Sequence, residues 1–325
     1  MIEVPEVFAR TTVEREGVAG GRWLAELPGI VAELLGRWGC VQDGGVMFGG
    51  VGVVVPVVRE GRMSAVLKVS FPHPGNVHEP DAFAVWAGRG AVLLYERDDA
   101  RFGMLLERVE AATLGETEGD EDVIASVAGD LSRRLAVPAP VRLPRLSDRA
   151  DEWAGQLDVD AEELAHGMAA RVLDAARETI RDLGRRQPDT LVHGDLHARN
   201  ILRAGREPWL AVDPKGYVGD PGYDGANFLK TRAFSLLAAP DLRAAALRVV
   251  DVFGEAAGIE RERLRRWAQL HAVQAAFWAR RHGFRVARGG PELDRITVFA
   301  EELAELLTDG KAFAAGRELP DHRPL

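Results

Sequence analysis

The 325-residue sequence contains one cysteine, Cys40. A single cysteine excludes an internal disulfide and any cysteine-based metal cluster, and it is typical of a reducing compartment. No apolar run approaches the ~20 residues that a membrane-spanning helix requires. The most apolar stretch, 51–58, contains Pro56 and favours a strand. The start of the chain is acidic and includes a proline, unlike a signal peptide. We therefore expect a cytoplasmic protein that does not enter a membrane.

The sequence also lacks an excess of positive charge. It has 41 Lys and Arg residues and 50 Asp and Glu residues, which give a formal net charge of −9. Nucleic acid as the main partner is excluded, since phosphate backbones require basic surfaces. Acidic surfaces attract cationic small molecules. Moderate acidity also keeps proteins soluble, so the charge leaves both interpretations open.

Apolar spacing divides the chain into a β-rich first part and a helical second part. In the first part, a turn at Glu60-Gly61 separates two runs of β-forming residues and predicts a hairpin. We expect strands at 53–58, 63–69, 91–95 and 102–106, a helix at 77–88, and a helix or helix pair over 23–38 interrupted at Pro28. After residue 110 we expect helices at 119–134, 161–186, 226–237, 242–257, 261–281 and 293–307, and a loosely held tail after 313.

Three polar residues between 195 and 213 have the spacing of a kinase active site. Asp195 is followed five residues later by Asn200, and Asp213 ends the apolar run 209–212. Protein kinases use this arrangement, in which the first Asp accepts the proton of the attacking hydroxyl. Asn200 and Asp213 supply the hard oxygen ligands that Mg²⁺ prefers. We expect Asp195 and Asn200 to point from one short loop into a cleft, with Asp213 facing them.

Simpler interpretations exist for the same residues. His193 and His197 are four apart, as zinc ligands on a helix are, but Gly194 and Asp195 between them disfavour a helix. We expect the ring of His193 to bind the backbone and fix the loop instead. A lone Asp213 would usually be a solvated turn residue, yet a carboxylate at the end of a buried strand requires a partner such as a metal ion.

The segment H-G-D-L-H-A-R-N at 193–200 resembles the aminoglycoside phosphotransferase family, whose loop reads H-G-D-x-H-x-x-N. The continuation 212–224 is similar to the streptomycin 6-kinase and hydroxyurea phosphotransferase branch. The resemblance covers nearly the whole chain from Trp23 onward. It implies an α+β, protein-kinase-like bilobal fold. The β-rich nucleotide-binding lobe would span 1–107, and the mainly helical lobe with the catalytic loop, metal site and acceptor site would span 108–325.

The resemblance also implies a nucleotide site. Lys68 would hold the phosphates of ATP, anchored by Glu79, although an exposed edge-strand lysine and Asp81 as its partner are alternatives. Glycine lets backbone N–H groups approach phosphates, so Gly49 and Gly50 are expected to cover them, with a plain hairpin turn as the alternative. The backbone near Glu107 and Val109 is expected to bind adenine.

Some positions bear on the acceptor. Arg199 departs from the family pattern and could narrow the acceptor site or pair with Asp220 or Asp224, which we expect to brace the catalytic loop. Lys215 could offset phosphoryl charge or form a surface ion pair. Glycines at 222 and 225 predict a flexible segment. Four residues on nearby helical turns are candidates for acceptor binding or for the core: Trp267, His271, Gln274 and Trp278.

The function implied is an ATP- and Mg²⁺-dependent phosphotransferase that acts on a hydroxyl of a small, cationic molecule. An aminoglycoside, inactivated as in antibiotic resistance, is the first candidate. A metabolic kinase of an amino sugar or similar metabolite is the second, because fold does not fix substrate. A catalytically silent nucleotide-binding protein is the third. The complete set Lys68, Asp195, Asn200 and Asp213 counts against the third.

Overall fold

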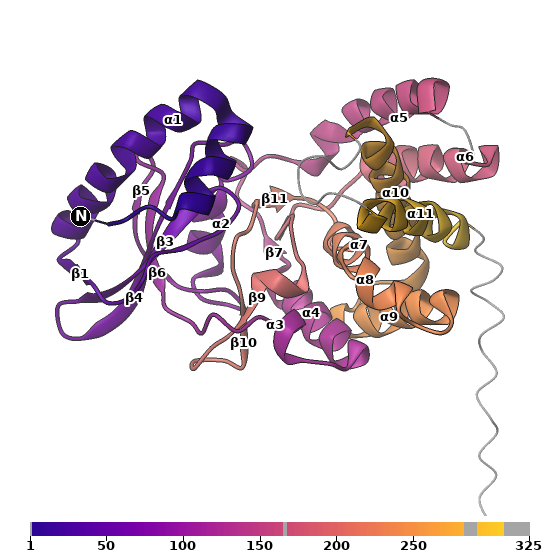
Figure 1. Ribbon diagram of the computed structural model, residues 1–325. Coiled ribbons are helices and arrows are strands. Elements are labelled where there is room, and N and C mark those ends of the chain that lie inside the picture. Colours follow the sequence, from indigo (N-terminus) through magenta and orange to yellow (C-terminus); the bar gives the residue numbers. More distant parts are fainter. Residues whose placement is uncertain (1, 165–167, 283–290, 309–325) are drawn as a thin grey trace, which may run out of the picture. The chain divides into compact units, whose positions relative to one another are not determined.

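The structure is a computed structural model that describes residues 2–164, 168–282 and 291–308. The chain forms two compact units (Figure 1). Unit 1 comprises Met1–Thr113 and Asn200–Gly216, and unit 2 comprises Leu114–Arg199 and Tyr217–Leu325.

Unit 1 contains an antiparallel sheet in the order β1-β3-β4-β6-β5, with β2 paired to β3. The predicted hairpin is confirmed as β3 and β4, which place Val54 opposite Lys68. The predicted strand at 91–95 begins later, at Leu94, and continues to Asp98. The strands are β1 (Cys40–Gln42), β2 (Met47–Phe48), β3 (Gly52–Arg59), β4 (Met63–Ser70), β5 (Leu94–Asp98) and β6 (Gly103–Glu107).

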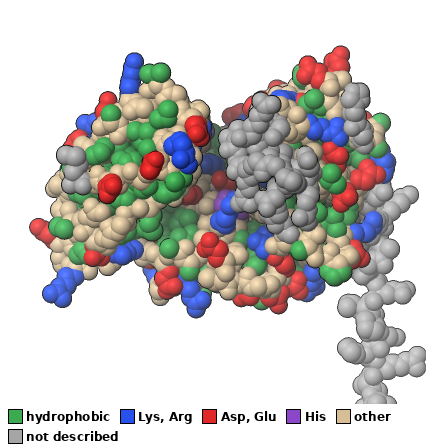
Figure 2. Space-filling view, viewed as in Figure 1, with side chains coloured by type: hydrophobic (Ala, Val, Ile, Leu, Met, Phe, Trp, Pro, Cys, Tyr) green, Lys and Arg blue, Asp and Glu red, His purple; other side chains and the backbone are tan. Residues whose placement is uncertain are grey.

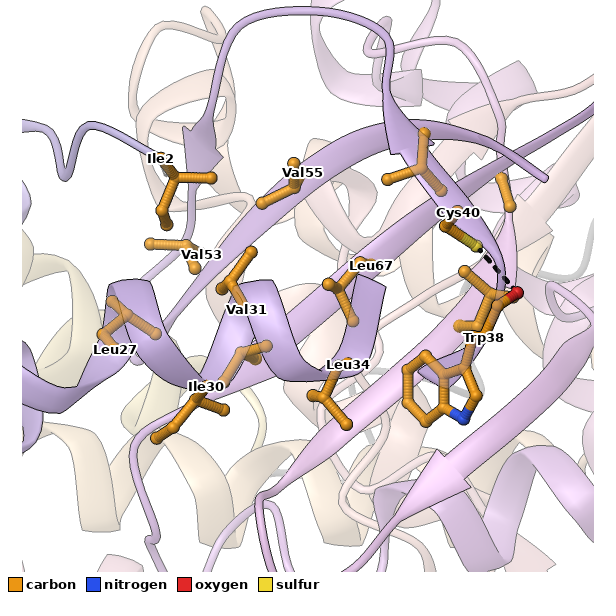
Figure 3. Packing of buried hydrophobic residues seen from close by; sticks show 14 of the residues in the cluster. Ile2, Leu27, Ile30, Val31, Leu34, Trp38, Cys40, Val53, Val55 and Leu67 are labelled. Atoms are coloured by element: carbon orange, nitrogen blue, oxygen red, sulfur yellow. Dashed lines mark hydrogen bonds between the residues drawn. The ribbon is translucent and has the colours of Figure 1, made fainter. Parts of the chain in front are cut away.

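Helix α1 (Glu6–Arg37) packs on this sheet and builds its core. Figure 3 shows Leu27, Val31 and Leu34 of the helix against Val53 and Leu67 of the strands. All five side chains are fully buried. Burial of this kind contributes roughly 1.5–3 kcal/mol to the stability of the fold for each large aliphatic side chain. Packing against this helix face therefore stabilises the sheet.

Of the two predictions for this region, the helix pair divided at Pro28 is wrong. Pro28 lies inside α1, and the irregular residue is Gly17, with φ 59° and ψ −134°. A glycine adopts this conformation without the steric penalty of a Cβ. Leu27 and Val31, on either side of Pro28, are both buried in the core.

Helix α2 (Glu79–Trp86) and the hairpin of β9 (Ile201–Arg203) and β10 (Trp209–Ala211) complete unit 1. The hairpin joins it through main-chain contacts. The N–H of Ala211 donates to the carbonyl of Gly90 at 2.9 Å, and Thr113 forms a bridge with Leu202. Asn200 and Asp213, which we expected in the second lobe, therefore belong to unit 1. The lobe boundary at residue 107 stays a prediction.

Unit 2 is mainly helical, with a small sheet in the order β11-β8-β7. Helix α4 packs on α9, and α10 packs on α6, α7 and α11. The elements are α3 (Leu114–Thr117), α4 (Glu121–Leu135), β7 (Val137–Pro138), α5 (Ala150–Leu164), α6 (Ala170–Thr179), β8 (Thr190–Val192), β11 (Tyr217–Val218), α7 (Gly222–Thr231), α8 (Ala233–Leu237), α9 (Leu242–Ala257), α10 (Arg261–His282) and α11 (Pro291–Leu306).

The predicted helices at 242–257 and 261–281 are confirmed as α9 and α10. A single helix over 161–186 is wrong, because Ala169 is extended (φ −64°, ψ 144°) and α6 begins after it. The apolar periodicity continues across this break, so the pattern alone conceals it. The predicted tail after 313 lies outside the described residues.

The surface carries acidic and basic side chains interspersed with apolar ones (Figure 2). Over the described ranges, no helix combines the length and apolar character that crossing a membrane requires.

Candidate active site

Lys68 lies at the centre of a buried ion-pair network in unit 1. Its ammonium donates to Oε1 of Glu79 at 2.6 Å and to Oδ1 of Asp213 at 2.5 Å. Lys68 and Glu79 are 7% and 2% exposed, so the edge-strand alternative is excluded. Asp81, the rival partner, instead accepts from Arg97 at 2.9 Å.

Burial and charge oppose each other in this network. Burial disfavours the charged form of Lys68, but the carboxylates of Asp213 and Glu79 outweigh it and raise its pKa above the ordinary value. Burial raises the pKa of Glu79 to about 7, although Lys68 opposes this shift. Lys68 therefore keeps its positive charge in the position where a phosphate would compete for it with Asp213.

Asp213 and Asn200 lie at the same end of the β9–β10 hairpin, because the N–H of Val212 donates to the carbonyl of Asn200 at 2.9 Å. Asp213 has a left-handed backbone (φ 57°). Such a conformation costs a non-glycine residue free energy and often occurs where function requires it. The Asp213 side chain is 48% exposed, so a carboxylate oxygen remains accessible while Lys68 is bound. One amide and one accessible carboxylate fit Mg²⁺, which keeps several waters and takes phosphate oxygens as further ligands.

The segment after Asp213 passes close to the start of α2. Gly216 has φ 68°, and a Cβ there would lie 2.9 Å from the carbonyl oxygen of His78. Only glycine fits this approach. Gly216 therefore allows the segment that follows Asp213 and the helix that carries Glu79 to lie together.

A cavity of about 720 Å³ in unit 1 is lined by residues of the sheet and of the segment after β6. Val109 lines it, as do Gly44 and Gly45. Gly49 and Gly50, the expected phosphate-covering residues, lie in the turn between β2 and β3, where Gly49 donates to the carbonyl of Gly52 at 2.9 Å.

The side chain of Glu107 forms hydrogen bonds with other residues of unit 1. Its carboxylate accepts from the N–H of Leu93 at 3.0 Å and from the guanidinium of Arg206 at 2.9 Å. Arg206 also donates to the carbonyls of Gly88 and Ala91. The side chain of Glu107 thus holds the end of β6.

Asp195 lies in unit 2, on a loop fixed by its neighbours. The N–H of Asp195 donates to Nδ1 of His193 at 3.2 Å, which confirms the structural role predicted for this histidine. Asp224 accepts from the N–H groups of His193 and Gly194 at 2.8 and 2.7 Å, so it braces the loop as expected. Among the described residues no group of three or more His, Cys, Asp or Glu is arranged for a metal ion, which leaves the zinc alternative without support.

Burial raises the pKa of Asp224 to about 7, although its two backbone hydrogen bonds favour the carboxylate. Asp220 has a different role, because it accepts from Arg263 at 2.6 Å and from the indole of Trp267 at 2.7 Å. It therefore secures α10. Arg199 is exposed and forms no ion pair with Asp220 or Asp224.

The flexible segment predicted from the glycines at 222 and 225 is wrong. Both lie in helix α7, where a Cβ at Gly222 would be 2.7 Å from Trp267 and one at Gly225 would be 2.5 Å from Leu264. Their small size lets α7 pack closely on α10, so they confer tight packing and not mobility.

Two residues near Asp195 were missed by the sequence analysis. The amide of Asn227 donates to Oδ1 of Asp195 at 3.3 Å and to the carbonyl of Leu196 at 3.1 Å. Burial lowers the pKa of Lys230, and Asp195 lies close enough for its carboxylate to oppose this shift. Both side chains come from α7, more than thirty residues further along the chain, so no local spacing indicates them.

A β-sheet unit with a lysine bound to two carboxylates, and a helical unit with an oriented aspartate, define a kinase-like phosphotransferase. Solved structures share this fold. An amicoumacin kinase, in complex with AMP-PNP and Ca²⁺, matches at a TM-score of 0.57 and 12% identity, over 86% of this chain and 96% of that one.

Sequence comparison gives the family. The aminoglycoside/hydroxyurea antibiotic resistance kinase family matches residues 37–283, and the chain belongs to it. A streptomycin 6-kinase of Streptomyces glaucescens is 34% identical over 86% of this chain and 91% of its own length. A hydroxyurea phosphotransferase of Kitasatospora aureofaciens is 35% identical over 86% of this chain and 80% of its own length. The chain is therefore a kinase that acts on the hydroxyl of a small molecule.

Proposed function

We propose that the protein transfers the γ-phosphoryl group of ATP to a hydroxyl of an aminoglycoside, as a streptomycin 6-kinase does. The observation that carries the proposal is the network of Lys68, Glu79 and Asp213, which holds a buried cation beside an accessible carboxylate. Phosphoryl transfer requires positioning and charge neutralisation more than covalent chemistry. The similar identity to a hydroxyurea phosphotransferase makes hydroxyurea the second candidate acceptor.

Each site residue has a role in this proposal. Asn200 and Asp213 hold Mg²⁺, which would neutralise phosphate charge, and Lys68 holds the phosphates. Gly49 and Gly50 cover the phosphates, and the backbone near Glu107 and Val109 binds adenine.

The transfer step makes one bond to phosphorus and breaks another. The acceptor oxygen forms a bond to the γ-phosphorus while the bond from that phosphorus to the leaving oxygen of ADP breaks. The proton of the acceptor hydroxyl passes to the carboxylate of Asp195, which Asn227 orients.

The proposal is tested by mass spectrometry of reactions that contain ATP, Mg²⁺ and streptomycin, hydroxyurea or glucosamine. A single added phosphate on streptomycin is expected, and it should be absent with Asp195→Asn. Phosphate on glucosamine alone would instead support a metabolic kinase. ATP binding without transfer to any acceptor would support a silent nucleotide-binding protein. The acidic net charge of −9 is compatible with a cationic acceptor.

A further inference from the structure

The mechanism above leaves His271 of helix α10 without a role. This residue is 4% exposed, and among the residues that the structure describes neither Nδ1 nor Nε2 has a hydrogen-bond partner. Buried polar groups nearly always have partners, because desolvation without compensation is costly. Two orphaned nitrogens on one buried ring therefore indicate a group that binds there.

Helix α7 links His271 to Asp195 within unit 2. Its ring meets the ring of Tyr223 edge-on, with centroids 4.5 Å apart and planes at 81°. Tyr223 lies on α7, whose residues 223, 227 and 230 are spaced i, i+4 and i+7 and therefore share one face. Asn227 on this face donates to Asp195. One helix face thus runs from the catalytic carboxylate to the unpartnered histidine.

The hydrogen-bonding groups and charges around His271 determine which chemical group can bind beside its ring. Burial lowers the pKa of His271 well below its ordinary value, and Lys230 and Arg149 lower it further. The ring is therefore neutral and presents one N–H donor and one acceptor nitrogen. A hydroxyl is both donor and acceptor and matches either nitrogen. An ammonium or guanidinium group is disfavoured beside two cations.

We propose that His271 is an acceptor-binding residue that hydrogen-bonds a hydroxyl of the acceptor other than the one attacked. Tyr223 forms an aromatic wall beside that hydroxyl, and Lys230 excludes a cationic group from the same position. The inference rests on the proposed function and adds to it the part of the acceptor that faces α7. Any cationic groups of the acceptor then lie away from this helix.

The test compares His271→Phe with a matched control. Phe keeps the ring and removes both nitrogens. Gln269→Leu changes a second buried polar residue of the same helix, whose Oε1 is also unpartnered and whose amide donates to the carbonyl of Val172. The hydrogen bonds of Gln269 go to Val172 of α6 and to Thr308, not to α7. Steady-state kinetics with streptomycin and with hydroxyurea, at saturating ATP, give the acceptor KM and kcat of each variant, and thermal unfolding gives its Tm.

The expected result is an acceptor KM about tenfold higher in His271→Phe, since one hydrogen bond of ordinary strength corresponds to roughly that factor. His271→Asn, which keeps a donor and an acceptor, should recover part of this loss. Gln269→Leu should lower Tm without raising the acceptor KM. If His271→Phe raises the acceptor KM no more than Gln269→Leu does, buried water satisfies the ring and the inference is overturned. If wild-type protein phosphorylates neither acceptor, the proposed function fails and the inference falls with it.

Discussion

Asn227 and Asp195 are joined by a hydrogen bond of 3.3 Å between Nδ2 of the amide and Oδ1 of the carboxylate. The same amide donates to the carbonyl of Leu196. Asn227 is 6% exposed, so its position is set by the packing of α7 and not by solvent. One oxygen of Asp195 is therefore oriented by a helix, while the loop backbone is fixed independently by Asp224.

Asn227→Leu should reduce kcat for phosphotransfer by roughly 10–100-fold, because a hydrogen bond to a charged group contributes about 1.5–3 kcal/mol. The effect arises from loss of orientation at Asp195. Steady-state kinetics measure it, with fluorescence titration of nucleotide as a second readout. A variant with wild-type kcat would show that the loop alone positions Asp195.

Asp195→Asn should abolish phosphotransfer with a loss of about 10²–10⁴-fold, as general-base removal typically does. Nucleotide affinity should stay close to wild type, since the residue acts on the acceptor. The control is Asp189→Asn, which changes an exposed carboxylate that pairs with Arg145. Equal activity of the two variants would exclude Asp195 as the base.

Asp213→Ala should remove the Mg²⁺ dependence of ATP binding, because the phosphates lose their metal-mediated link to the protein. Calorimetric titrations with and without Mg²⁺ give the two affinities, and their ratio should fall toward one. A ratio unchanged from wild type would show that the metal is held elsewhere.

Lys68→Met should lower kcat/KM for ATP while leaving the protein folded. The variant removes the cation beside Glu79, but the pKa of that carboxyl is already raised to about 7, so Glu79 can remain neutral without its partner. Circular dichroism and Tm check the fold, and ATP-dependent transfer checks the activity. Unfolding of the variant would mean that Glu79 stays ionised and requires the lysine.

His271→Phe should make the stability of the protein less dependent on pH between 6.5 and 5. The folded-state pKa of His271 lies well below 6.5, so in this range the unfolded chain binds a proton that the folded chain does not. Wild-type stability therefore falls as pH decreases, by up to about 1.4 kcal/mol per pH unit from this one group. Urea unfolding at several pH values measures both slopes. Identical slopes would show that the ring is protonated in the folded protein.

Local patterns predicted the parts of the fold that local chemistry determines. Helix α9 was predicted from apolar spacing alone, and the structure adds that Asp241 caps its start by accepting from the N–H of Ala244 and that Gly258 ends it with a left-handed backbone. Lys68 and Glu79 were found because the family motif places them. Asn227 was missed, and His271 was one of four candidates for acceptor binding or for the core, because the contacts of both depend on how α7 packs on α10. The break at Ala169 was missed because apolar spacing continues through it.

Unit 1 is built from two separate stretches of the sequence, and this affects when it is completed during synthesis of the chain. Its last segment, 200–216, follows the whole of 114–199, yet this segment supplies β9, β10, Arg206 and Asp213. The sheet emerges early from the ribosome, but the carbonyls of Gly88 and Ala91 obtain their Arg206 donor only later. At roughly 5–20 residues per second the nascent sheet waits several seconds for this partner. Unit 1 is thus completed only after 114–199 of unit 2 has been translated.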